Sequence, residues 1–181
     1  RLDALGIPYQ EFYKVIEFGN NLDEEDCNRL EEALLKMGIL DALVIDEQYK
    51  EQVLHLKQGC EDRYLFSCKN VQKELQPGKS LLDVLELNEE VNDIFSNQRL
   101  TGILGSIAYD NESMITVAED GTYRIGVLAG TVTGEYEAGF LGTKARERHR
   151  QAKMEACRQR IAELEEVLQQ LEEMYLSLIH I

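Results

Sequence analysis

Residues 143–175, TKARERHRQAKMEACRQRIAELEEVLQQLEEMY, contain no glycine or proline and are rich in residues that favour the α-helix. Their apolar positions are separated alternately by three and four residues, which places them on one narrow seam with a period of about 3.5, as in a coiled coil. The apolar seam consists of Met154, Cys157, Ile161, Leu164, Leu168, Leu171 and Tyr175. A helix packed back onto its own domain usually has a wider apolar stripe. The pattern therefore favours an outgoing coiled-coil arm over residues 143–176, with a folded-back helix as the alternative.

Upstream of the arm, residues 1–142 mix helix and strand signals. The clearest is a β-hairpin, because Asp120-Gly121 separates two strand-like runs at residues 114–118 and 122–128. A helix is expected to begin after Asp23, a favourable cap, and to end near Gly38. Further strands are expected over residues 13–18, 42–45, 64–68 and 102–109, and further helices over residues 80–85 and 89–97. We predict an α+β fold, in which a compact mixed helix and strand domain is followed by a long coiled-coil helix.

Both ends of the sequence indicate a piece of a longer protein. The first residue is Arg1, and residues 1–5 resemble the end of an element that has already begun. Residues 177–181, SLIHI, abruptly abandon the charge-rich pattern of the arm and are similar to adapter read-through at the end of a gene fragment. We expect these five residues to be a non-native tail.

The bulk composition indicates a soluble protein of the cytoplasm. The chain has a net charge of −15 at pH 7, with 44% hydrophobic and 29% charged residues. No apolar run approaches the roughly 18 residues that a membrane helix needs, so no membrane partner is expected. Its four cysteines form neither a C-x-x-C pair nor a metal-binding cluster with the histidines, which predicts reduced thiols. A cytoplasmic location follows, with association with the nucleoid as a further option.

The tripeptide Gly78-Lys79-Ser80 ends like a nucleotide-binding P-loop. A P-loop also needs a glycine five residues before its Gly-Lys pair, so that backbone amides can surround a phosphate. Lys73 occupies that position here, and Pro77 removes one amide from the loop. We therefore interpret the segment as a turn, with Ser80 as the cap of the next helix.

No other motif identifies a reaction. The sequence has no H-x-x-x-H, D-x-D-x-D or G-x-S-x-G pattern, so we assign no catalytic, cofactor-binding or metal-ligating residue and expect no cofactor in this chain. Spacing alone remains compatible with a pair of catalytic carboxylates. A small α+β enzyme or nucleotide-binding domain that uses Asp and Glu is therefore an alternative.

Basic residues are concentrated at the start of the arm. Residues 144–160 hold seven Lys and Arg against two Glu, and Lys144, Arg148, Arg150 and Lys153 could contact DNA phosphates. The region contains no Phe, Tyr or Trp that could stack on a base. Ordinary solvation of a helix is the favoured interpretation, and a DNA-contacting adaptor is the alternative.

Three segments near the arm resemble a known family when they are taken in order. They are residues 123–130 (YRIGVLAG), 137–146 (EAGFLGTKAR) and 160–165 (RIAELE). Together they resemble the middle region of SMC-like ATPases of the Wadjet plasmid-defence type, the JetC-like relatives of bacterial condensin. In that family a hairpin reading YRLG.L.G leads through YIG..AR into a coiled coil that begins RIAELE. Here residues 140–142 (FLG) depart modestly from the aromatic-branched-glycine element.

The likeness extends upstream and spans about residues 5–175. Residues 7–9, 15–18, 22–23 and 30–42 are similar to the family's entry segment, and residues 80–85 fit a further short patch. Each motif is short, so the order of the motifs is the stronger part of the resemblance.

The resemblance implies a position within a larger machine. Proteins of this family have an ATPase head built from both chain ends, joined by antiparallel coiled coils to a central hinge where two subunits pair. This chain would then be the hinge with the outgoing coil, and its partners would be a second copy of itself, the incoming coiled-coil helix and DNA. ATP and Mg would belong to heads outside this chain. We expect a non-catalytic hinge and dimerisation module of a DNA-translocating ATPase that acts in chromosome organisation or plasmid defence.

Overall fold

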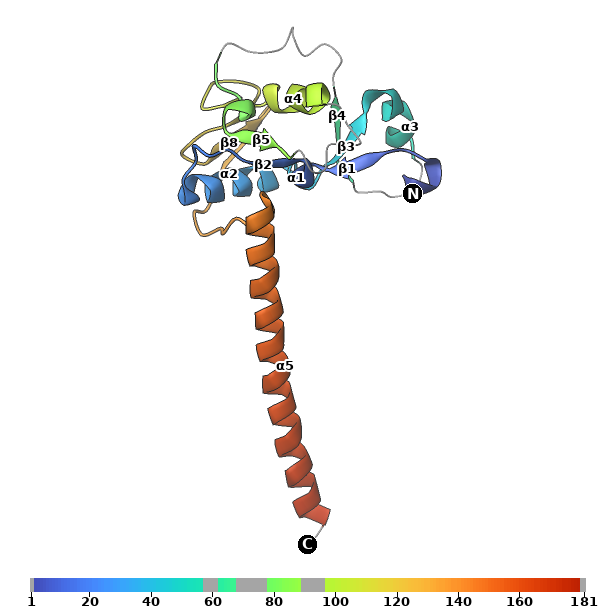
Figure 1. Ribbon diagram of the computed structural model, residues 1–181, viewed down its shortest axis with the longest axis vertical. Helices are drawn as coiled ribbons and strands as arrows, with labels where there is room; N and C mark the ends of the chain where they lie inside the picture. The colour runs from blue at the N-terminus through green and yellow to red at the C-terminus, as the bar shows by residue number, and fades with distance from the viewer. Residues whose placement is uncertain (1, 57–61, 68–77, 89–96, 180–181) are drawn as a thin grey trace. The chain divides into compact units, whose positions relative to one another are not determined.

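The computed structural model describes residues 2–56, 62–67, 78–88 and 97–179. Contacts divide the chain into two units, Arg1–Thr143 and Lys144–Ile181, and each is described by itself. The first unit mixes short helices and strands, and the second is one long helix (Figure 1). This arrangement confirms the predicted α+β class with a long C-terminal helix. The predicted helix over residues 89–97 lies almost entirely outside the described residues, as does Cys68 at the end of a predicted strand.

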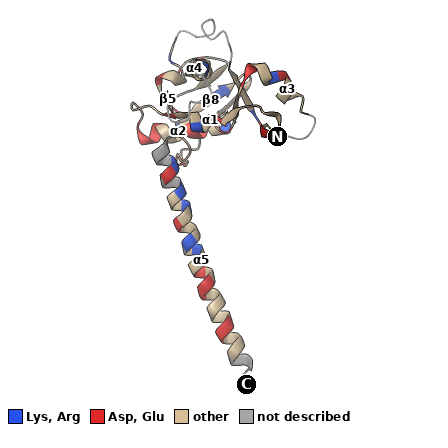
Figure 2. Ribbon diagram, turned by 45° about the vertical axis from the view of Figure 1, so that its right-hand side comes forward, with Lys and Arg blue, Asp and Glu red and all other residues tan. Residues whose placement is uncertain are grey.

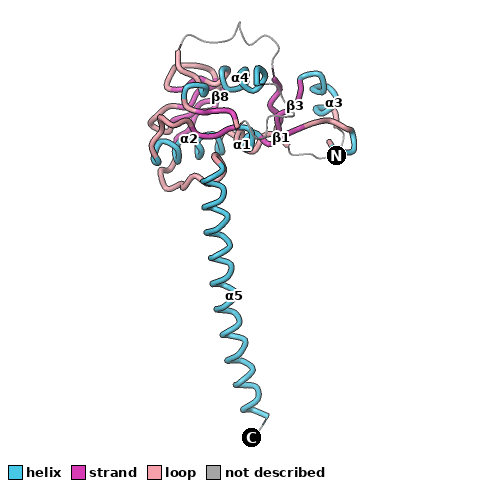
Figure 3. Tube along the Cα trace, viewed as in Figure 1, coloured by secondary structure: helices cyan, strands magenta, loops and turns pink. Residues whose placement is uncertain are grey.

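The described residues of the first unit form three small sheets (Figure 3). The first sheet has the order β1-β3-β4, in which β1 is antiparallel to β3 and β3 is parallel to β4. The second pairs β2 with β5, and the third has the order β6-β7-β8-β9. The strands are β1 (Tyr9–Glu11), β2 (Ile16–Phe18), β3 (Leu43–Asp46), β4 (Tyr64–Ser67), β5 (Leu85–Leu87), β6 (Ala108–Tyr109), β7 (Ile115–Val117), β8 (Thr122–Ile125) and β9 (Leu128–Thr131).

Helices connect and cover these sheets. They are α1 (Phe12–Val15), α2 (Glu24–Lys36), α3 (Lys50–Leu54), α4 (Asn97–Gly105) and α5 (Thr143–Ile179), with single 3-10 turns at Asp3–Leu5, Glu47–Tyr49 and Leu81–Asp83. The start of α2 is as predicted, because the backbone N–H of Asp26 donates to Asp23 Oδ1 at 2.8 Å. Its end is also as predicted, since Gly38 adopts a φ of 69°, a conformation that glycine tolerates best.

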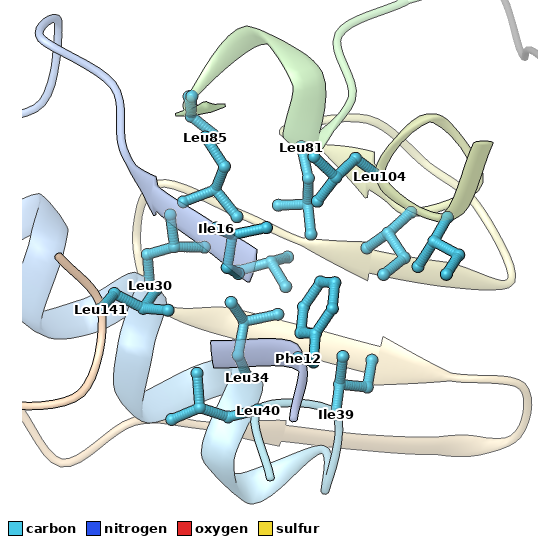
Figure 4. Packing of buried hydrophobic residues seen from close by; sticks show 14 of the residues in the cluster. Phe12, Ile16, Leu30, Leu34, Ile39, Leu40, Leu81, Leu85, Leu104 and Leu141 are labelled. Carbon is cyan, nitrogen blue, oxygen red and sulfur yellow. The ribbon is translucent and has the colours of Figure 1, made fainter. Parts of the chain in front are cut away.

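The main core joins parts of the chain that are far apart in sequence. Phe12, Leu34, Leu81, Leu104 and Leu141 are all fully buried in one cluster, and Figure 4 shows these side chains together. Burying each such side chain contributes about 1.5–3 kcal/mol relative to its exposure. Leu141 belongs to this cluster, so the segment just before α5 is anchored in the core of the first unit.

The hairpin prediction is confirmed for its first two strands. Strands β7 and β8 are antiparallel with Val117 opposite Tyr123, and Gly121 in the turn has a φ of 81°. The predicted second strand, however, does not run through residue 128. The chain turns at Gly126, which has a φ of 59°, and Leu128 begins β9. The sequence therefore makes a three-stranded meander where we expected a single hairpin.

Three other predicted elements are wrong in part. Residues 13–15 lie in α1 and not in a strand, because one helical turn brings Phe12 and Val15 into the core together. Residues 102–105 lie in α4, where Leu100, Ile103 and Leu104 are buried at helical spacing that we read as strand. The helix after Ser80 is a single 3-10 turn, and Leu85 belongs to β5.

Candidate functional site

Helix α5 carries the apolar seam on its surface. The helix spans 37 residues, and six of the seven seam residues are among its exposed large hydrophobic side chains, with exposed fractions of 45% at Met154 and 65% at Tyr175. Cys157 is exposed as well. Val167 and Met174, next to the seam, are also more than half exposed, so the apolar surface is wider in the second half of the helix. That the seam pairs with another helix remains a prediction.

The four residues predicted to contact DNA all lie along α5, and the structure describes the side chains of two of them, Arg150 and Lys153. Lys144 and Arg148 lie on α5, but their side chains are outside the described residues. Arg150 is bonded to Glu147, with Nη2 to Oε1 at 2.9 Å and Nε to Oε2 at 3.0 Å. These bonds hold the pKa of Glu147 below its usual value and the pKa of Arg150 above its own. Lys153 is exposed. DNA contact therefore remains a prediction.

Charge is distributed unevenly along α5. Figure 2 shows Lys and Arg gathered in the first half of the helix and Asp and Glu in the second half. Residues 161–176 contain five Glu and no Lys or Arg. Arg160 contacts Glu163 at 2.8 Å, where the two halves meet.

The segment of residues 132–142, called the strap here, connects β9 to α5 and is held by α2. The Glu31 carboxylate is fully buried and accepts four hydrogen bonds of 2.7–3.1 Å from one stretch of the strap. The donors are the Tyr136 hydroxyl and the backbone N–H groups of Gly139, Phe140 and Leu141. Burial and the bond to Glu31 together raise the pKa of the Tyr136 phenol well above its usual value.

Two neighbours of Glu31 on α2 extend this contact. Glu32 Oε1 accepts from the Thr133 hydroxyl at 2.8 Å and from its backbone N–H at 3.1 Å. Lys36 Nζ lies 3.0 Å from the same oxygen. Burial alone would raise the pKa of Glu32, but the hydrogen bonds from Lys36 and Thr133 outweigh it and lower the pKa. Asn28 Oδ1 accepts from the Ala138 N–H at 2.8 Å.

Sequence reasoning missed this contact. Glu31 and Glu32 are adjacent in a helix, where a pair of acidic residues is usually solvated. Their donors lie more than a hundred positions further along the chain, so no local pattern connects them. The bonds to Glu31 come mainly from the backbone, which leaves no side-chain signature in the strap. The arrangement fixes a conformation and presents no reacting group.

The predicted helix cap at Ser80 is confirmed, whereas the turn predicted before it includes Pro77, which lies outside the described residues. Ser80 Oγ accepts from the Leu82 N–H at 3.3 Å, and the Ser80 N–H donates to Asp83 Oδ2 at 2.7 Å. These reciprocal bonds form a capping box. The Lys79 ammonium lies 3.7 Å from Glu119 on the surface. The Ser80 N–H and the Lys79 ammonium are thus engaged within the domain.

Among the described strands, none pairs with the outer edge of β9, so this edge of the third sheet is open. Strand β9 is the last in the order β6-β7-β8-β9, and most of its residues are exposed. At its start Val127 is fully exposed and Leu128 is 57% exposed. An open strand edge flanked by apolar side chains is a surface on which another chain can pair.

In the described residues, no group of three or more His, Cys, Asp or Glu side chains lies close enough to hold a metal ion. None of the helices in that same part of the chain has the length and apolarity to cross a membrane.

The fold resembles two solved structures from Pyrococcus furiosus. The Pyrococcus furiosus SMC protein hinge domain matches with a TM-score of 0.43 and 17% identity, over 78% of this chain and 82% of that chain. The Pyrococcus furiosus Smc hinge domain with an extended coiled coil matches with a TM-score of 0.39 and 19% identity, over 90% of this chain and 64% of that chain. No protein-family model and no curated protein matches the chain.

Both structural neighbours are SMC hinge domains, the class that the sequence resemblance predicts. At these identities and scores the likeness carries no functional argument of its own. The finer prediction of a Wadjet-type protein rests on the residues of this chain.

Proposed function

We propose that this chain is the hinge and dimerisation part of an SMC-like ATPase and is itself non-catalytic. The observation that carries the proposal is α5, a helix of 37 residues whose apolar seam is exposed. Long helices owe most of their stability to packing of an apolar face, so this seam calls for a partner helix. We assign that role to an incoming arm of the same polypeptide.

The open edge of β9 supports self-association of the first unit. The edge joins an exposed apolar turn at Val127 and Leu128, and strand pairing between two copies would cover both features. Two such domains would link two arms, while ATP and Mg would act at heads outside this chain. A role in chromosome organisation or in plasmid defence of the Wadjet type follows from the resemblance of residues 123–165.

Sedimentation of the chain tests the dimer. We expect a dimer that Val127→Lys combined with Leu128→Lys shifts to monomer, because two charges at the strand edge oppose pairing. Leu54→Lys is the matched control, since Leu54 is also exposed, at 54%, but lies on α3. A chain that stays monomeric at high concentration would refute the proposal. A dimer that resists the double change would refute the role of β9.

A further inference from the structure

Two kinds of charge flank the apolar seam of α5. In the first half, Lys153 precedes Met154 and Arg158 follows Cys157. In the second half, Glu165 follows Leu164 and Glu172 follows Leu171. In a coiled coil, the residue directly before the first member of each pair of seam residues spaced three apart, and the residue directly after the second member, lie beside the partner and form its ion pairs.

Several of these flanking charges have no partner on α5 itself. Among the side chains that the structure describes, Lys153, Glu165 and Glu172 make no ion pair. Arg158 lies 3.8 Å from Glu155, a long and exposed contact. Exposed pairs of this kind are weak, so Arg158 remains available to a stronger partner.

We propose that α5 selects a partner helix of complementary charge. The partner carries acidic residues where it flanks Lys153 and Arg158, and basic residues where it flanks Glu165 and Glu172. A helix with uniform charge would meet like charge along one half of α5, and like charges destabilise such contacts. The inference rests on the proposed pairing of α5 and adds the chemistry of its partner.

Three synthetic helices of about 28 residues, or four heptads, test the proposal against the full chain. All three have leucine seams. Two of them carry Glu at the flanking positions that face the basic half of α5 and Lys at those that face the acidic half. One is designed to pair parallel to α5 and the other antiparallel. The third carries Gln at every flank. Fluorescence anisotropy of each labelled peptide measures its affinity for the chain.

We expect one of the two charged peptides to bind about tenfold more tightly than the Gln peptide at low salt. The tighter direction then gives the direction of the partner. The advantage should disappear near 1 M salt, where screening acts within about 3 Å. Equal affinity of the Gln peptide and both charged peptides would overturn the proposed charge selection but leave pairing of α5 intact. If none of the three binds, the pairing in the proposed function is wrong as well.

Two double variants locate the effect on the helix. Glu165→Lys with Glu172→Lys changes the flanks, whereas Glu166→Lys with Glu173→Lys makes the same change of net charge on the outer face. The flank variant should lose the tenfold advantage and the outer-face variant should keep it. If both variants lose the tenfold advantage equally, the advantage depends only on the net charge of the helix, and the proposal is overturned.

A second copy of this chain is the competing occupant of the seam. Sedimentation of the chain with Leu164→Asn and Leu168→Asn distinguishes it, because these changes place polar groups in the seam. A dimer lost in this variant would show that the seam is covered by a second copy, which would overturn the assignment to a separate helix. A dimer unchanged by it supports that assignment.

Discussion

Replacing Glu31 by Gln should release the strap from α2. The two carboxylate oxygens accept hydrogen bonds from Tyr136, Gly139, Phe140 and Leu141, and Glu31 is fully buried. Glutamine keeps the size of the side chain but replaces one acceptor oxygen by an NH2 donor. If the glutamine oxygen accepts from Tyr136 and Gly139, its NH2 group faces the Leu141 N–H. Two hydrogen-bond donors then point at each other, and neither finds an acceptor there.

The cost follows from the groups left without an acceptor. A buried N–H without a partner costs about 1–3 kcal/mol, and hydrogen bonds to a charged acceptor contribute about 1.5–3 kcal/mol each, more than neutral ones. We expect Glu31→Gln to lower the free energy of unfolding of the first unit by about 3–5 kcal/mol. That is a large share of the total stability of a domain of this size, about 5–15 kcal/mol.

Urea denaturation, monitored by the near-ultraviolet signal of the tyrosines, measures the change in the free energy of unfolding. Hydrogen exchange measures the local loosening of the strap. The amides of Gly139, Phe140 and Leu141 should lose protection before those of β7 and β8 do. Glu112→Gln is the matched control, because Glu112 is exposed and should change stability by no more than about 0.5 kcal/mol. A Glu31→Gln chain as stable as the control, with those three amides still protected, would refute this account of the strap.

Three smaller effects follow from hydrogen bonds of the first unit. Tyr136→Phe should cost about 1–2 kcal/mol in urea denaturation, since the bond to Glu31 is lost but its other donors remain; no change would show that the hydroxyl is dispensable. Ser80→Ala should cost about 1 kcal/mol through loss of the cap, and an unchanged urea midpoint would show that the cap is dispensable. The pKa of Glu32 is lowered from its usual value of 4.5, so this group stabilises the fold fully above that pH, and its contribution is lost as the pH falls below it. Glu32→Gln should therefore flatten the decline of the urea midpoint between about pH 5 and about pH 3, and an unchanged slope would contradict the assignment.

The parts of the fold that the sequence predicted are those in which local chemistry decides. Asp23 and Gly38 bound α2 because a cap and a left-handed residue act over a few positions. The turn at Asp120-Gly121 and the helical character of residues 143–175 have equally local causes. In each case the signal and the structure that it specifies lie within a few residues of each other.

The errors occur where packing overrides a local preference. Residues 13–15 favour a strand by composition, yet α1 forms because both Phe12 and Val15 gain burial from one helical turn. In α4, Ile103 and Leu104 fit a strand as well as a helix when they are read in a short window. Only the position of the surrounding core decides between the two.

The strap could not have been found from the sequence, because its anchor and its donors are far apart and the donors are mostly backbone groups. The apolar seam, by contrast, is visible as a repeat along one helix. The number of basic residues at the start of α5 is evident from the sequence. The bond between Arg150 and Glu147 is not, because it depends on the side-chain rotamers.

The hydrogen bonds to Glu31 depend little on which side chains the strap carries. Three of the four donors are backbone N–H groups, which every residue except proline supplies. A library that randomises residues 137–140 should therefore yield folded variants with many compositions, excluding proline at 138, 139 and 140, whose N–H groups all donate to α2. The same library at Glu31 should return glutamate almost alone. The strap can thus be rewritten, for example to carry a label or a binding peptide, while one residue of α2 keeps its path.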